Sequence, residues 1–218
     1  MKMTQLNPHF WDKIAAGYAL RPVGDVASYA YKLEQMSQHL VAGMTVLEIG
    51  CGTGSTAITL AQKHPDVEFV AEDFSPEMIN IAKAKAIHLG LDNLTFNCNC
   101  AEQGLLGEAQ FDMIIAMNLV LLVPDWQAMV VQAASKLKPN GWWVSGHFWL
   151  GEVNLLIKLL AKPLIKIGQL MGRLPEHLHF LKRKAYCEAI QAAGLTIETD
   201  WHPPGKPKVF FIMAQRSA

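Results

Sequence analysis

The stretch VLEIGCGTG, residues 46–54, decides the fold: a short apolar segment runs into three alternating glycines and then into a helical pattern from Ser55. A strand that turns directly into a helix is the beginning of a βαβ unit. Glycines let the backbone turn tightly and approach a ligand without a Cβ atom in the way, and the N-terminus of the following helix offers free N–H groups. We therefore expect a nucleotide-like cofactor to bind at this turn.

Short apolar runs alternate with helical patterns on both sides of this turn. Five of these runs are expected to be strands, at residues 45–49, 68–72, 94–98, 111–117 and 142–148. Helices are expected at 56–63, 77–89 and 126–137, and the chain closes with two strand-like segments at 195–201 and 208–215. Such alternation is typical of a parallel sheet covered by helices. The sequence predicts an α/β fold: a doubly wound, mostly parallel seven-stranded sheet with helices on both faces and an antiparallel last strand.

The length of 218 residues fits a single domain with two additions to the alternating core. Residues 1–42 are expected to form an N-terminal helical cap, and residues 150–181 a helical insertion that serves as a lid. Within the insertion, residues 153–167 carry lysines four apart among leucines and isoleucines, with Pro163 expected to interrupt the helix. This stretch is either a lid over a substrate pocket or a contact with a membrane surface or lipid.

Composition narrows the class of partner. Lys plus Arg and Asp plus Glu each number 19, so the formal charge is zero and nucleic acid is not expected as a partner. The chain is 51% hydrophobic and 17% charged, which excludes disorder. The sequence contains no stretch long enough to span a membrane, no signal-peptide pattern and no metal-ligand spacing. We therefore expect a cytoplasmic protein without a metal site. If the protein contacts a membrane, we expect the contact to be made by residues 153–167.

Two acids bear on the kind of cofactor. Asp73 follows the second strand, about twenty residues beyond the glycines, where a carboxylate can accept hydrogen bonds from ribose hydroxyls. A dinucleotide fingerprint would place Gly or Ala where Ser55 stands, and Glu48 disfavours a pyrophosphate but suits an ammonium group. S-adenosylmethionine carries such a group.

The spaced motifs together resemble the class I S-adenosylmethionine-dependent methyltransferases. They are the acid and glycines of residues 48–54, Asp73, and the phrase LKPNG at 137–141 before the fifth strand. The opening helix, from Phe10 to Tyr18, resembles that of small-molecule methyltransferases such as those of ubiquinone and menaquinone biosynthesis. The resemblance assigns the following residues to the cofactor: Tyr18, Glu48, Gly50, Cys51, Gly52, Gly54, Asp73, Phe74, Cys100, Ala101, Glu102 and Asn118.

The resemblance also implies roles for these residues. The glycines line the methionine and ribose portion, Glu48 holds the amino group, Asp73 takes the ribose hydroxyls, and Phe74 packs on the adenine. Tyr18 approaches the carboxylate end, with Arg21 as a charge partner. Asn118 borders both the methionine end and the acceptor.

The sequence departs from the family at the residue that accepts from the adenine amino group. Family members commonly have an aspartate there, and Cys100 stands in its place. Glu102 could substitute from two residues on, or the backbone of Ala101 and apolar packing could suffice.

The function expected from the resemblance is methyl transfer from S-adenosylmethionine to a small, hydrophobic acceptor. The acceptor is expected to be small and hydrophobic because the regions that form the pocket are apolar and aromatic. The general base is open, with His147 and Glu102 as candidates, whereas His177 and His179 are expected on the surface. Two alternatives remain: a non-catalytic S-adenosylmethionine-binding module, and an NAD-dependent oxidoreductase, which Glu48 and Ser55 disfavour.

Overall fold

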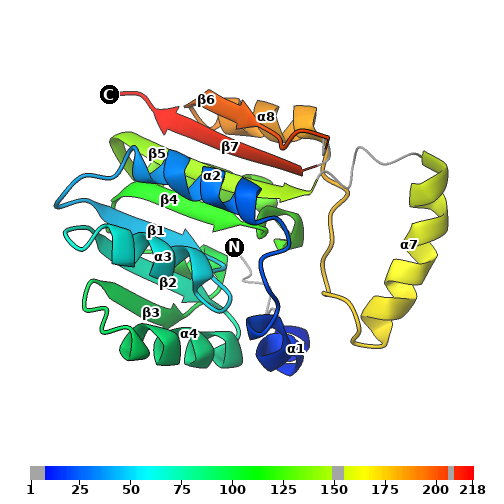
Figure 1. Ribbon diagram of the computed structural model, residues 1–218. Helices are drawn as coiled ribbons and strands as arrows, with labels where there is room; N and C mark the ends of the chain where they lie inside the picture. Colours follow the sequence, from blue (N-terminus) through cyan, green and yellow to red (C-terminus); the bar gives the residue numbers. More distant parts are fainter. Residues whose placement is uncertain (1–7, 149–154, 206–208) are drawn as a thin grey trace.

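The computed structural model describes residues 8–148, 155–205 and 209–218. It contains one seven-stranded sheet in the order β3-β2-β1-β4-β5-β7-β6 (Figure 1). The strands are β1 (Thr45–Ile49), β2 (Glu68–Asp73), β3 (Leu94–Cys98), β4 (Phe111–Met117), β5 (Leu137–Phe148), β6 (Leu195–Trp201) and β7 (Val209–Arg216). β1 to β5 pair in parallel, and β7 pairs antiparallel with both β5 and β6. The predicted sheet is confirmed.

Helices cover both faces of the sheet. They are α1 (His9–Ala19), α2 (Val26–Ser37), α3 (Ser55–Lys63), α4 (Pro76–His88), α5 (Ala101–Gly104), the 3₁₀ turn η1 (Val120–Leu122), α6 (Trp126–Lys136), α7 (Leu155–Leu170) and α8 (Arg183–Ala192). Two buried clusters result, one joining α2, α3 and α4 to the sheet and the other joining α5, α6 and α8 to it. Neighbouring strand residues point to opposite faces, so Val46 lies in one cluster and Leu47 in the other. Two-sided burial explains the continuous apolar runs.

Side-chain caps fix two of the helix starts where the sequence predicts them. The Ser75 hydroxyl accepts from the Met78 N–H at 3.2 Å, with Pro76 at the first helical position of α4. Asp125 accepts from the Ala128 N–H at 3.1 Å at the start of α6. These caps set the direction in which each helix leaves the sheet.

The fifth strand begins earlier than predicted, at Leu137. The LKPNG segment, residues 137–141, was expected to form a turn before this strand, but it lies within the strand. The pairing of β4 with β5 is irregular there, between Phe111 and Met113 of β4. Asn140 takes a φ of +63°, a conformation that asparagine tolerates, so the turn residues are absorbed as a local distortion of the ladder.

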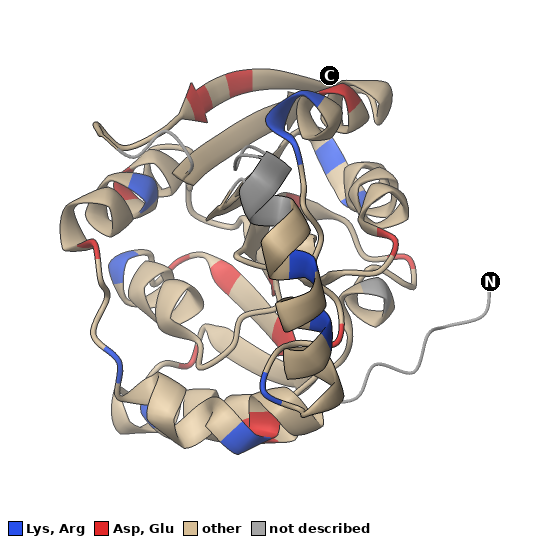
Figure 2. Ribbon diagram, turned by 90° about the vertical axis from the view of Figure 1, so that its right-hand side faces the viewer, with Lys and Arg blue, Asp and Glu red and all other residues tan. Residues whose placement is uncertain are grey.

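Helix α7 differs from expectation because it runs through Pro163 without ending. The carbonyl that loses its partner belongs to Leu159, which is exposed, so water can satisfy it. Figures 1 and 2 show α7 apart from the sheet, on the side to which β1 and β4 point. The cap 1–42 and the insertion 150–181 remain predictions, and residues 1–7 and 149–154 lie outside the described ranges. Among the described residues, no helix is long and apolar enough to cross a membrane.

Gly54 is expected to be the least replaceable glycine of the turn. It has a φ of +76°, and a Cβ atom there would lie 2.8 Å from Phe96 Cζ. Gly90 is a matched control, since its φ is +65° but a Cβ atom would meet nothing within 4 Å. Gly90→Ala should cost about 1–2 kcal/mol from backbone strain alone, and Gly54→Ala about 1–3 kcal/mol more from overpacking. Denaturant unfolding of both variants measures the difference, and equal losses would contradict this packing role.

Candidate functional site

The candidate site lies at the carboxyl ends of β1, β2 and β4, where the strand order reverses between β1 and β4. Ligands bind at such switch points in open α/β sheets. Two adjoining cavities open here, of about 420 Å³ and 620 Å³, which we call the first and second cavity. The residues that line both are Tyr18, Gly50, Gly52, Met117, Asn118 and Phe148. The cavities therefore meet at the glycine turn and at the end of β4.

The three glycines of the turn face different surroundings. A Cβ atom on Gly50, whose φ is +67°, would lie 2.6 Å from Leu119 Cδ1, so a side chain there would require Leu119 to move. Gly52 has a φ of +55°, and the nearest atom to its Cβ position is 3.9 Å away, on Tyr18 across the turn. Gly54 lines neither cavity, in contrast to its assignment from the resemblance, because its Cα faces β3 and α4. Gly52 is therefore the position that leaves room for a ligand.

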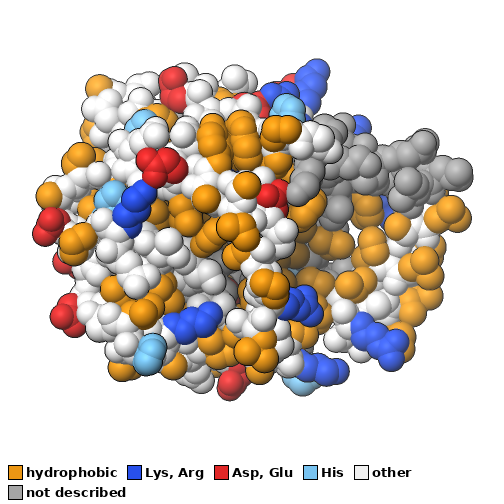
Figure 3. Space-filling model, viewed as in Figure 1, with side chains coloured by type: hydrophobic (Ala, Val, Ile, Leu, Met, Phe, Trp, Pro, Cys, Tyr) orange, Lys and Arg blue, Asp and Glu red, His pale blue; other side chains and the backbone are white. Residues whose placement is uncertain are grey.

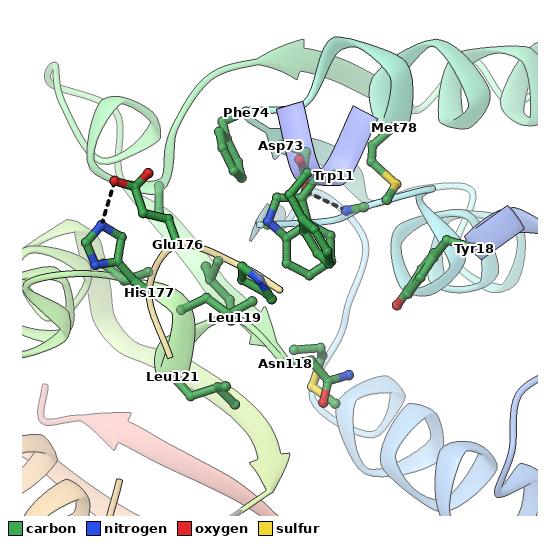
Figure 4. A pocket seen from close by; sticks show the side chains of 18 of the residues that line it. Trp11, Tyr18, Asp73, Phe74, Met78, Asn118, Leu119, Leu121, Glu176 and His177 are labelled. Carbon is green, nitrogen blue, oxygen red and sulfur yellow. Dashed lines mark hydrogen bonds and ion pairs between the residues drawn. The ribbon is translucent and has the colours of Figure 1, made fainter. Parts of the chain in front are cut away.

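Asp73 holds the glycine turn against the end of β2. Its Oδ2 accepts from the Gly52 N–H at 2.8 Å (Figure 4), and its Oδ1 accepts from the Ser75 N–H at 2.9 Å. Burial raises the pKa of this carboxyl. Asp73 also lines the first cavity, and each carboxylate oxygen can accept more than one hydrogen bond. It can therefore receive hydroxyl groups from a ligand while it keeps the turn in place.

Glu48 is a buried acid at the wall of the second cavity. Its Oε2 accepts from the Ala57 N–H at 2.9 Å, in the first turn of α3. Burial, with the nearby charge of Asp73, raises the pKa of Glu48 to about 8. A carboxyl group in this state gains from a cation placed beside it, because the cation favours the ionised form.

Helix α1 covers the site. Asp12 accepts from the Ser75 hydroxyl and, at 3.4 Å, from the Glu77 N–H, which attaches α1 to the start of α4. This attachment brings Trp11 and Tyr18 to the first cavity (Figure 4). Burial raises the pKa of Tyr18, so its hydroxyl stays protonated at neutral pH.

At the cavity wall where the sequence predicted Cys100, the structure places Asn99. Cys100 is the residue before α5, its N–H donates to Gln103 Oε1 at 3.0 Å, and it lines neither cavity. Asn99 lines the first cavity and donates its Nδ2 to Glu72 Oε1 at 2.9 Å. With its nitrogen engaged, the amide presents its carbonyl oxygen as an acceptor. Of the alternatives weighed from sequence, Ala101 lines the first cavity, and the side chain of Glu102 lies outside the described residues.

His147 does not reach either cavity and is not retained as a candidate base. It is 1% exposed and its ring packs edge-on against Phe210 at 4.1 Å between centroids. Burial lowers the pKa of His147 to about 3. The reason is strand alternation: Ser145 and His147 point toward α8, and Phe148 points the other way, into the cavities.

The remaining wall of the first cavity is apolar apart from one pair of residues. Its members come from η1, from its flanking residues and from the segment after α7: Leu119, Leu121, Leu122, Val123, Pro175, Glu176 and His177. His177, expected on the surface, is half-buried and faces Glu176 across 4.0 Å between Nε2 and Oε1 (Figure 4). No spacing in the sequence indicates this pair, because the chain returns to the site only after α7.

Phe74 lines the first cavity, Cys51 lines the second, and Tyr18 and Asn118 line both. Residues 40–201 match the family model described as a methyltransferase domain.

The chain belongs to this methyltransferase family. It is 30% identical over 190 residues to a ubiquinone biosynthesis O-methyltransferase of Bradyrhizobium diazoefficiens, covering 82% of this chain and 70% of the relative. It is 24% identical over 205 residues to the protein of the same name from Chromobacterium violaceum, covering 91% and 82%. The magnesium protoporphyrin IX methyltransferase of Synechocystis, solved with bound S-adenosylhomocysteine, shares the fold with a TM-score of 0.68 at 20% identity, covering 96% and 93%.

The methyltransferase is therefore an S-adenosylmethionine-dependent enzyme, as the glycine turn and the two acids predict. The alternatives of an NAD-dependent oxidoreductase and a non-catalytic binding module are set aside.

Cofactor binding is expected to release a proton from Glu48. At pH 7 this carboxyl, with a pKa of about 8, is mostly protonated, and a cation beside it lowers that pKa. Calorimetric titration with S-adenosylmethionine in buffers of different ionisation enthalpy should report release of about one proton in the wild type. Glu48→Gln keeps an oxygen that can accept from the Ala57 N–H, and this variant should release almost no proton on binding. Equal proton release by both proteins would contradict the role of Glu48.

Asn99 and Cys100 can be told apart by substitution. Asn99→Ala removes an acceptor from the cavity and should weaken S-adenosylhomocysteine binding about tenfold. Cys100→Ala should leave the affinity nearly unchanged, because its side chain faces α5 rather than the cavity. The dissociation constants of S-adenosylhomocysteine from the two variants distinguish these roles. A larger loss of affinity in Cys100→Ala than in Asn99→Ala would indicate that Cys100 faces the adenine.

Proposed function

We propose that the enzyme transfers the methyl group of S-adenosylmethionine to a hydroxyl oxygen of a small, apolar molecule of the phenol class. The observation that carries this proposal is the apolar end of the first cavity, lined by Leu119, Leu121, Leu122 and Phe148. The relatives named as ubiquinone biosynthesis O-methyltransferases support a hydroxyl acceptor with an apolar body. An apolar wall favours such a molecule over a charged metabolite, whose burial is costly.

The cofactor fits the remaining lining residues. The buried acid Glu48 suits the ammonium group, with Arg21 and Tyr18 of the second cavity near the carboxylate. Asp73 takes the ribose hydroxyls beside the open position at Gly52. Phe74 packs on the adenine, and the Asn99 carbonyl accepts from its amino group.

The protein's contribution to the reaction is alignment and exclusion of water. S-adenosylmethionine supplies a methyl group on a positively charged sulfur, which a nucleophile displaces in line. Asn118 and Met117 lie where the cavities meet, so they border both the methyl donor and the acceptor. Trp11 covers the site from α1, and the segment of Pro175 closes its other side. A water-poor site keeps water from competing with the acceptor oxygen.

A labelling experiment tests the reaction. Purified enzyme with methyl-labelled S-adenosylmethionine and a prenylated catechol should yield label in the organic phase, as a methyl ether identified by mass spectrometry. An equally apolar acceptor without a hydroxyl group is the control and should stay unlabelled. Turnover of polar amines or carboxylic acids in place of the catechol would contradict the proposed acceptor class.

For α7 we propose a peripheral contact with a membrane surface. Leu160, Leu164 and Ile167 of α7 and Met171 directly after it are all exposed and follow one another at helical spacing, so they form a stripe. Lys162 and Lys166 fall on the opposite side of the helix by the same spacing. Figure 3 shows hydrophobic side chains along α7. An amphipathic helix of this kind lies in the headgroup region, and an apolar acceptor could then enter the site from the membrane.

The alternative role for α7 is a lid. Its position in front of the strand ends favours a lid (Figure 2), but no described α7 residue lines either cavity. The membrane contact is therefore the role we put to the test.

Substitution of the α7 stripe should weaken vesicle binding. The double variant Leu164→Glu with Ile167→Glu places charges in the apolar stripe and should reduce co-flotation with anionic phospholipid vesicles at least tenfold, since each buried leucine or isoleucine contributes about 1.5–3 kcal/mol. Val131→Glu, at a similarly exposed site on α6, is the matched control and should bind as the wild type does. Unchanged flotation of the double variant, together with a loss of turnover on a water-soluble catechol, would favour the lid.

A further inference from the structure

The first cavity contains few groups that could take a proton from an acceptor. Among its described lining residues, the side chains that can ionise are those of Tyr18, Asp73, Glu176 and His177. A phenol of ordinary acidity enters an apolar pocket in its neutral form, because burial of an unpaired anion is costly. Efficient transfer to its oxygen therefore needs a base inside the cavity.

Two of these four groups, Asp73 and Tyr18, do not fit the role of the base. Both carboxylate oxygens of Asp73 accept backbone N–H groups at the glycine turn, at the cofactor end of the cavity. Tyr18 has a raised pKa, so it remains protonated at neutral pH and can donate but not accept a proton. Figure 4 shows Tyr18 on the side of the cavity opposite to Glu176 and His177. The pair Glu176 and His177 is what remains, and it lies among the apolar residues of the acceptor end.

The segment that carries this pair is fixed in place. The His179 N–H donates to the Leu121 carbonyl at 2.8 Å, which joins the segment to η1. Leu181, two residues on, is 4% exposed and packs in the core cluster beneath the site. The two anchors hold the His177 ring at the cavity wall, with 30% of its side chain exposed. A general base must be held in a fixed position at the pocket, and the two anchors provide that.

We propose that His177 is the general base of the reaction and that Glu176 is its positioning residue. The inference rests on the proposed transfer to a hydroxyl group. A ring nitrogen of His177 takes the hydroxyl proton as the acceptor oxygen forms its bond to the methyl carbon. The carbon–sulfur bond breaks, and its electron pair stays on sulfur as a neutral thioether. The carboxylate of Glu176, 4.0 Å from Nε2, stabilises the imidazolium that forms. That proton then passes to water.

The acidity of the acceptor provides the test. Catechol is neutral at pH 7.5 and needs a base, whereas 4-nitrocatechol is largely ionised in solution and does not. His177→Gln should lower kcat on catechol roughly a hundredfold or more, but kcat on 4-nitrocatechol less than tenfold. Glu176→Gln should show the same dependence on acceptor acidity with a smaller loss, roughly tenfold on catechol. Binding of S-adenosylhomocysteine should be unchanged in both variants, which shows that the fold and the cofactor site are intact.

The matched control is His179→Gln, which keeps the backbone bond to Leu121 and should leave both rates unchanged. Equal losses on the two acceptors would show that His177 only shapes the cavity and would overturn the proposal, as would an unchanged rate on catechol. A wild-type enzyme that binds the cofactor but methylates neither catechol would instead overturn the proposed function, and the base with it.

Discussion

The bond between Asp73 and the Gly52 N–H is the interaction on which the site depends. β1 and β2 pair in parallel with Ile49 opposite Glu72, so the carboxylate of Asp73 at the end of β2 lies directly beside the turn after β1. The Cys51 N–H donates to the Glu72 carbonyl at 2.9 Å and continues this pairing past the end of β1. The turn cannot relax without breaking both contacts. They fix the start of α3, and with it the opening between the two cavities.

Polarity changes from one end of the site to the other. The buried acids Glu48 and Asp73 lie at the cofactor end, and burial raises the pKa of both. The other end is formed by η1 and its neighbours, which are apolar, together with the pair of Glu176 and His177. A cationic cofactor relieves the cost of the buried acids, and an apolar acceptor suits the opposite end. In the function we propose, the two ends therefore bind different molecules and bring them together at Asn118.

The sequence predicts those features that depend on neighbours along the chain, and fails where the outcome depends on distant contacts. The glycine turn, Asp73 and the cap at Ser75 are local, and their positions are confirmed. The end of the strand that carries His147 is predicted correctly, but the side of the sheet to which this side chain points depends on packing against α8. The choice between Asn99 and Cys100 depends on the residue at which α5 begins. His177 reaches the cavity because distant anchors in η1 and the core hold its segment there, which no spacing can indicate.

The most direct test of the account is a crystal structure of the enzyme with S-adenosylhomocysteine and a catechol. We expect the adenine amino group within hydrogen-bond distance of Asn99 Oδ1, the ribose on Asp73, and the amino acid portion extending to Glu48 in the second cavity. The catechol ring should lie against Leu121 and Leu122, with one hydroxyl facing His177. An adenine bound away from Asn99, or a catechol outside the first cavity, would contradict the account.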